Sequence, residues 1–180
     1  MIRVNDKAFI EGWHYLRYKF MLPGQLGKPR KDLRAYIEAR RAEASAEVRL
    51  ALRLLVEGYT RNAAGKAFQA FKSLLAALAG ERREELRNSI KNVDKVIAYM
   101  PTSMIRDVGK LLGLEKESLL ALALHQYQYN GVDPEGIMSI YTSRDAAMKD
   151  ICNLLDSVVR VLGDEPLKQE LSNVCGSFQG

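Results

Sequence analysis

Apolar residues recur every three to four positions along nearly the whole chain, and this spacing is the period of an amphipathic α-helix. The clearest stripe starts after Ser143 and stops at Gly163, with apolar positions at Ala147, Ile151, Leu154, Val158 and Leu162. No run of alternating apolar and polar residues bounded by turn residues is found, so no strand is expected. The pattern predicts an all-α protein.

Two long helices joined by a tight corner are predicted in the first half of the chain. The first begins near Lys31 and has an apolar stripe made of Leu33, Ile37, Ala44, Val48, Leu52 and Leu55. Gly58 and Tyr59 form the corner, and the second helix begins near Thr60 and ends at Gly80. Because the connection is short, the two helices must pack against each other as an antiparallel hairpin.

Other helices are predicted on both sides of this hairpin. A helix over 5–21 would place Phe9, Trp13, Leu16 and Phe20 on one face, and a linker over 22–28 follows it. Further helices are expected over 81–99, 104–112, 115–129 and 143–162, with another element opening at Asp133-Pro134-Glu135 and at most a short helix after Pro166. The chain then divides into an amino-terminal helix and linker (1–28), a helical bundle (29–163) and a C-terminal tail or short helix (164–180).

The helix over 115–129 has almost no polar side, because it is apolar at Leu119, Leu120, Leu122, Ala123 and Leu124. A helix that is apolar all round either lies at the centre of its own bundle or is shared with a second subunit. We therefore expect a homodimer that is paired through its apolar helices.

The length of 180 residues fits one domain, and the net charge of +5 is unevenly distributed. Residues 1–34 contain eight Lys and Arg against three acids, so the rest of the chain is neutral. With the aromatic residues of 9–20, this basic arm could bind RNA or a nucleotide through Arg17, Lys19, Lys28, Arg30 and Lys31. Alternatively, the same helix docks on the bundle or rests on an anionic membrane surface.

Several classes of protein and site are excluded or disfavoured. No apolar run is long enough to span a bilayer and no secretory signal precedes the first helix, so we expect a cytoplasmic protein. In that compartment Cys152 and Cys175 are expected to be two free thiols, because small disulfide-bonded domains are denser in cysteine. The His and Cys spacings match no metal site, and no glycine-rich phosphate loop is present. No metal or cofactor is predicted.

His125 is the one ionisable side chain in the apolar part of this helix, directly after the run 119–124. Tyr127, Tyr129 and Asn130 lie near it in sequence. A buried imidazole can act as a general base, which makes His125 the only catalytic candidate. The alternative is a histidine that packs in the core or in an interface.

The hairpin and the helix around His125 resemble the archaeal PaREP1 family, helical proteins similar to HEPN domains. The resemblance rests on the family-motif residues Gly58, Tyr59, Lys66, Ala67, His125 and Tyr129, and it extends over about residues 38–163. Gly65 departs from the expected pattern, which has an acid before the lysine. The resemblance implies an up-and-down antiparallel helical bundle, here with five to seven helices, often paired into a homodimer.

HEPN relatives that cut RNA use an arginine followed by four to six residues and a histidine. The corresponding positions before His125 are Ser118 to Leu120, and those before His14 are Lys7 to Phe9, so no arginine is in place. We therefore expect a non-enzymatic helical binding or assembly module that binds RNA or a nucleotide. The alternative is an unconventional RNase that uses His125, with Lys66 or a partner's arginine at the phosphate, or the toxin component of a toxin–antitoxin pair.

Overall fold

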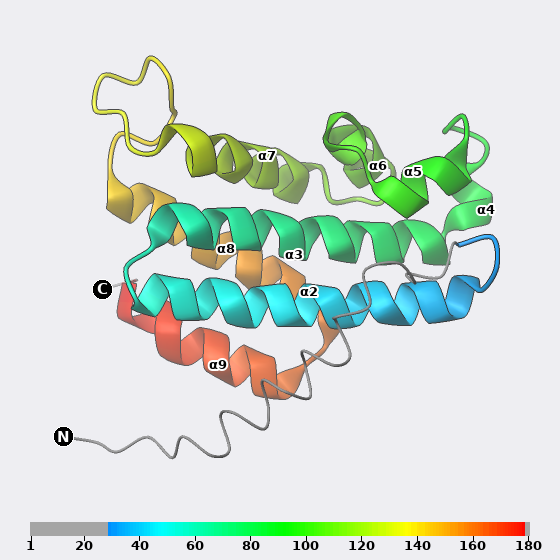
Figure 1. Cartoon of the computed structure of the whole chain (residues 1–180), viewed down its shortest axis with the longest axis horizontal. Coiled ribbons are helices and arrows are strands. Elements are labelled where there is room, and N and C mark those ends of the chain that lie inside the picture. The colour runs from blue at the N-terminus through cyan, green and yellow to red at the C-terminus, as the bar shows by residue number, and fades with distance from the viewer. Residues whose placement is uncertain (1–28, 179–180) are drawn as a thin grey trace.

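The computed structural model describes residues 29–178, and within this range every regular element is a helix (Figure 1). The prediction of an all-α helical bundle is confirmed, although the described residues form eight α-helices rather than five to seven. The elements are α2 (Leu33–Val56), α3 (Thr60–Glu81), α4 (Arg83–Leu86), α5 (Val93–Tyr99), the 3-10 turn η1 (Thr102–Met104), α6 (Ile105–Leu111), α7 (Glu115–Asn130), α8 (Arg144–Leu162), α9 (Glu165–Cys175) and the 3-10 turn η2 (Gly176–Phe178). The helix expected over 5–21 lies outside the described residues.

The predicted hairpin is confirmed as α2 and α3, and α3 is the central helix of the bundle. Asp32 begins α2 by accepting the backbone N–H of Ala35 at 2.9 Å. Against α3 pack α2, α7 and α8, with α5 and α6 near its C-terminal half (Figure 1). Alanines on the facing sides of α2 and α3 leave little standoff between the two backbones, and these residues are fully buried: Ala44, Ala51, Ala63, Ala67 and Ala70.

The single helix predicted over 81–99 is wrong, because the chain breaks there into α4 and α5. Asn92 adopts the left-handed conformation with φ 56°, which asparagine tolerates better than most residues and which a helix cannot contain. The guanidinium of Arg83 donates to Asp94 at 2.5 Å, and this pair ties α4 to the first turn of α5. Local turn preferences and this contact outweigh the apolar spacing that suggested continuity.

The helical element expected at Asp133-Pro134-Glu135 is also wrong, since residues 131–143 form an irregular loop. The carboxylate of Asp133 accepts the backbone N–H groups of Glu135, Met138 and Ser139 at 3.1, 2.5 and 3.3 Å. Asp133 therefore stabilises a compact loop by the same chemistry that would have capped a helix. The next helix, α8, begins after Ser143, whose hydroxyl accepts the Ala146 N–H, as predicted.

The expectation of two free thiols is wrong, because Cys152 and Cys175 form a disulfide between α8 and α9. Their Cα atoms are 5.8 Å apart, within the usual range for a bridge. Cys152 lies 11 residues before Gly163 and Cys175 lies 12 residues after it, so the reversal at Gly163 brings the two side by side. Cysteine density could not reveal this symmetry about the turn.

The helix α7 lies beside α3 and is less enclosed than its sequence suggested. Ala121 and Leu124 are fully buried, whereas Leu119 is 46% exposed.

Among the described helices, none is both long and apolar enough to cross a bilayer.

A candidate ligand pocket between α3 and α7

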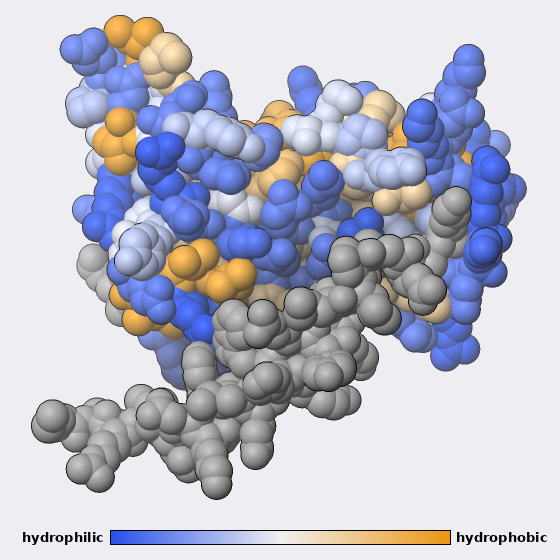
Figure 2. All heavy atoms as spheres, in the orientation of Figure 1, coloured by the Kyte–Doolittle hydropathy of each residue, from blue (hydrophilic) through white to orange (hydrophobic). Residues whose placement is uncertain are grey.

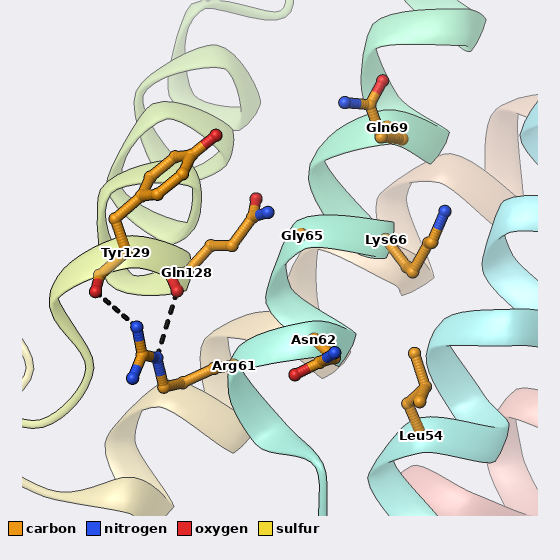
Figure 3. Close-up of a pocket in the computed structure, with 8 residues that line it drawn as sticks. All are labelled: Leu54, Arg61, Asn62, Gly65, Lys66, Gln69, Gln128 and Tyr129. Carbon is orange, nitrogen blue, oxygen red and sulfur yellow. Dashed lines mark hydrogen bonds between the residues drawn. The ribbon is translucent and has the colours of Figure 1, made fainter.

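A pocket of about 510 Å³ opens over the N-terminal half of α3, bounded by the C-terminal turns of α7 and of α2 (Figure 3). Its floor consists of α3 residues spaced at i, i+3, i+4 and i+7, which places them on one face of the helix. The lining residues are Leu54 from α2, Arg61, Asn62, Gly65, Lys66 and Gln69 from α3, and Gln128 and Tyr129 from α7.

Gly65 sets the depth of this pocket and the position of its α7 wall. A Cβ at residue 65 would lie 2.6 Å from Cδ and 2.7 Å from Oε1 of Gln128, so the glutamine side chain occupies the space that a larger residue would fill. Figure 3 shows Gln128 extending from α7 toward Gly65. Gly65 therefore allows α7 to place a carboxamide against the backbone of α3.

Arg61 fastens the end of α7 to the start of α3. Its Nε donates to the Gln128 carbonyl at 3.0 Å and its Nη2 donates to the Tyr129 carbonyl, both in the last turn of α7 (Figure 3). These carbonyls have no partner within the helix, so a cation placed here also opposes the negative end of the helix dipole. Arg61 thus holds the wall that presents Gln128 and Tyr129, while its remaining N–H donors stay available.

Lys66 is the second cation of the pocket, and its charge is paired with a carboxylate that does not line the pocket. Its Nζ lies 3.1 Å from Oε2 of Glu47, a residue of α2 that does not line the pocket. The other polar lining groups are the carboxamides of Asn62, Gln69 and Gln128, which can both donate and accept hydrogen bonds. The lining residues include no carboxylate, imidazole or thiol.

His125 lies next to the pocket but does not line it. Its ring stacks on Phe68 with centroids 4.1 Å apart, and the ring of Tyr129 meets it edge-on at 5.3 Å. Burial lowers the pKa of His125, a hydrogen bond with Gln128 opposes that effect, and the positive charge of Lys72 lowers the pKa further. Its buried Nδ1 finds no hydrogen-bond partner among the described residues. The imidazole is therefore mainly neutral at pH 7.

The other five family-motif residues fall into three places. Lys66 and Tyr129 line the pocket, while Ala67 is buried in the core beneath it. Gly58 and Tyr59 form the corner between α2 and α3, where the Gly58 carbonyl accepts Nη2 of Arg144 at 2.8 Å.

Of the basic residues proposed for RNA binding, the structure describes Arg30 and Lys31. Arg17, Lys19 and Lys28 are outside the described residues. Arg30 donates to Asp94 at 3.2 Å, and Lys31 is exposed. Both precede α2, at the opposite end of that helix from Leu54, so they do not belong to the pocket.

Sequence reasoning missed most of the pocket, namely Leu54, Arg61, Asn62, Gly65, Gln69 and Gln128. One signal was present: on the Ala-rich α3, the polar residues Asn62, Lys66 and Gln69 share one face where a buried helix would have apolar ones. The contribution of α7 was not visible, because Gln128 approaches Gly65 only through the tertiary packing.

A sequence model of the archaeal PaREP1/PaREP8 family matches residues 39–152. The chain belongs to this family. The matched segment includes every residue that lines the pocket, so the PaREP1 region of the chain contains the whole site. No curated protein and no solved structure matches the chain.

Proposed function

We propose that this PaREP1 chain is a non-enzymatic binding module and that its pocket takes a nucleotide or another small phosphate-bearing ligand. The observation that carries the proposal is the chemistry of the lining, which combines two cations, three carboxamides and one tyrosine with no acidic group. The volume of about 510 Å³ falls within the ~300–1,000 Å³ of small-molecule sites.

Each kind of lining group has a counterpart in such a ligand. Lys66 and the unused donors of Arg61 attract the negative charge of a phosphate, and both side chains are common phosphate binders. Asn62, Gln69 and Gln128 offer the mixture of donors and acceptors that the edge of a nucleobase requires. The ring of Tyr129 is largely exposed and offers a surface on which a base can stack.

The proposal favours binding over catalysis because His125, the catalytic candidate, is used in packing. Its ring stacks on Phe68, and this packing supports a structural role for His125. The alternative of an unconventional RNase requires His125 to exchange a proton with a substrate. RNA cleavage by the wild-type chain that disappears in His125→Ala, with thermal stability retained, would establish that alternative.

Isothermal titration calorimetry of the full chain with ATP, AMP, adenosine and inorganic phosphate tests the binding proposal. Lys66→Gln removes one charge and should weaken the binding of AMP at least about tenfold, since a hydrogen bond to a charged group contributes about 1.5–3 kcal/mol. Lys110→Gln on the exposed side of α6 is the matched control and should bind as the wild type does. The absence of binding for all four compounds, or an equal weakening in both variants, would refute the assignment of the pocket.

A further inference from the structure

Large apolar side chains are exposed together at one end of the bundle. The loop 131–143 projects there beyond the end of α7 (Figure 1), and Ile137, Met138 and Ile140 on it are 75%, 65% and 67% exposed. Figure 2 shows apolar atoms on this projection. We define the end face as seven exposed residues: Val56, Tyr59, Tyr129, Val132, Ile137, Met138 and Ile140.

The two parts of the end face, the corner after α2 and the loop after α7, are joined by contacts. Arg144, which follows the loop, donates from Nε to the Thr60 hydroxyl at 2.7 Å and from Nη2 to the Gly58 carbonyl. At the start of the loop, a Cβ on Gly131 would lie 3.4 Å from Cδ of Arg61. Corner and loop therefore lie next to each other at this end of the bundle.

Hydrogen bonds order the backbone of the loop that carries these apolar side chains. Asp133 accepts three backbone N–H groups of the loop, and its own N–H donates to the Tyr141 carbonyl at 2.9 Å. The Asn130 side chain donates to the Met138 carbonyl at 2.6 Å, and the hydroxyl of buried Tyr141 donates to Asp150 at 3.0 Å. A surface that is ordered before it meets a partner loses little conformational entropy on binding.

We infer that the end face is the surface through which two copies of this chain associate. Its seven side chains expose roughly 100 Å² each, or on the order of 700 Å² together. A standard interface buries about 800 Å² per partner, so the apolar side chains of the end face can supply most of that area. A two-fold axis allows such pairing because the same patch is present on both copies.

The charges around the end face favour a second copy over a polyanion. The exposed Glu57, Glu135 and Asp145 lie at this end together with Arg61 and Arg144. Two faces of mixed charge do not repel each other, and acids of one copy can approach arginines of the other. A nucleic acid or an anionic bilayer would need a predominantly positive surface instead.

The end face shares Tyr129 with the pocket, whereas its other six residues do not line the pocket. Pairing through the end face also differs from pairing through residues 119–124. On that segment only Leu119 is strongly exposed among the large apolar residues, and Leu124 is covered by the chain's own bundle. A single exposed leucine offers too little area for a stable interface.

Sedimentation equilibrium of the full chain without ligand tests the inference. The wild type should be dimeric, and the double variant Ile137→Ser with Ile140→Ser should raise the dimer dissociation constant at least about tenfold. Because both side chains are exposed, the thermal melt of the monomer should stay unchanged. The controls Leu119→Ser, on α7, and Tyr99→Ser, an exposed tyrosine at the end of α5, should leave the dimer intact.

Three results would overturn the inference. They are a wild type that stays monomeric at every concentration, a dimer that Leu119→Ser dissociates while the double variant does not, and a dimer that no variant affects. A monomeric wild type that sediments with phosphatidylserine vesicles, and no longer does so in the double variant, would identify a bilayer as the occupant instead.

Discussion

Gly65 illustrates how one missing side chain shapes the pocket. An alanine there would force Gln128 away from α3, but the atoms it meets are the end of a flexible side chain. Because alanine favours a helix interior over glycine by about 0.5–1 kcal/mol, we expect Gly65→Ala to leave the free energy of unfolding unchanged or slightly higher. The same change should weaken AMP binding, since it moves a lining residue and fills space. Urea unfolding and calorimetry on one preparation measure both effects.

Gly109 supplies the contrast for that experiment. A Cβ at residue 109 of α6 would lie 1.8 Å from Oγ of Ser118 and 3.0 Å from the carbonyl oxygen of Leu114, and Ser118 already donates to that carbonyl. We expect Gly109→Ala to lower the free energy of unfolding by about 1–3 kcal/mol, as overpacking does, without a direct effect on the pocket. A Gly65→Ala variant that is destabilised as strongly would show that Gly65 supports packing rather than the pocket.

At the scale of an element, the loop 131–143 depends on the charge of Asp133. Hydrogen bonds from backbone N–H groups of the loop hold the pKa of Asp133 below its ordinary value, and the bond from Met138 has the largest effect. Their contribution to the order of the loop is therefore complete above the ordinary pKa of an aspartate and disappears as the pH falls through the lower, folded-state pKa. We expect Asp133→Ala at pH 7 to reproduce that effect as faster amide hydrogen exchange at Met138 and Ser139.

Glu135→Ala is the control for this loop, because Glu135 donates to Asp133 only through its backbone N–H, which the substitution keeps. Its exchange rates should match those of the wild type. If Asp133→Ala also exchanges as the wild type does, the carboxylate is not what orders the loop.

The disulfide between α8 and α9 is the second stabilising feature at the scale of an element. It closes a segment with a sequence separation of 23 residues, for which the chain-entropy model gives a stabilisation of about 3 kcal/mol. We expect Cys152→Ala with Cys175→Ala to lower the free energy of unfolding by about that much in urea. The fold should persist, because Leu167 and Leu171 remain buried and still pack α9 against the bundle. Adding a reductant should destabilise the wild type and leave the double variant unchanged; an equal response of both would contradict the assignment.

The elements themselves were predictable where periodicity and a local cap agreed. The stripe after Ser143 and the corner at Gly58 specify α8 and the hairpin, because the apolar spacing and the terminating residues indicate the same boundaries. At Asn92 and Asp133 these two signals compete, and a left-handed turn and a carboxylate-bound loop prevailed over the helical spacing. Such outcomes depend on contacts such as Arg83 with Asp94, which a continuous helix would hold about three turns apart.

At the scale of the whole molecule, the candidate site was less predictable than the fold. Lys66 and Tyr129 were identified through the resemblance, but the pocket they line also needs Gln128 to approach Gly65 across two helices. The periodicity of a single helix carries no information on the distance between Gln128 and Gly65, which lie on different helices. The charge pattern indicated the amino-terminal arm, whereas the polar cavity is lined by residues between 54 and 129.

The arm and the pocket can be separated by deleting residues 1–28. This segment has five cations and two acids, so it supplies +3 of the net charge of +5. If the arm binds RNA, the deletion should weaken the binding of a single-stranded oligonucleotide and reduce the slope of log K against log salt by ~0.7 for each phosphate that the arm neutralises. AMP binding in the pocket should be unchanged, because all lining residues remain. Fluorescence anisotropy at several salt concentrations measures the slope, and an unchanged slope would remove the arm from RNA binding.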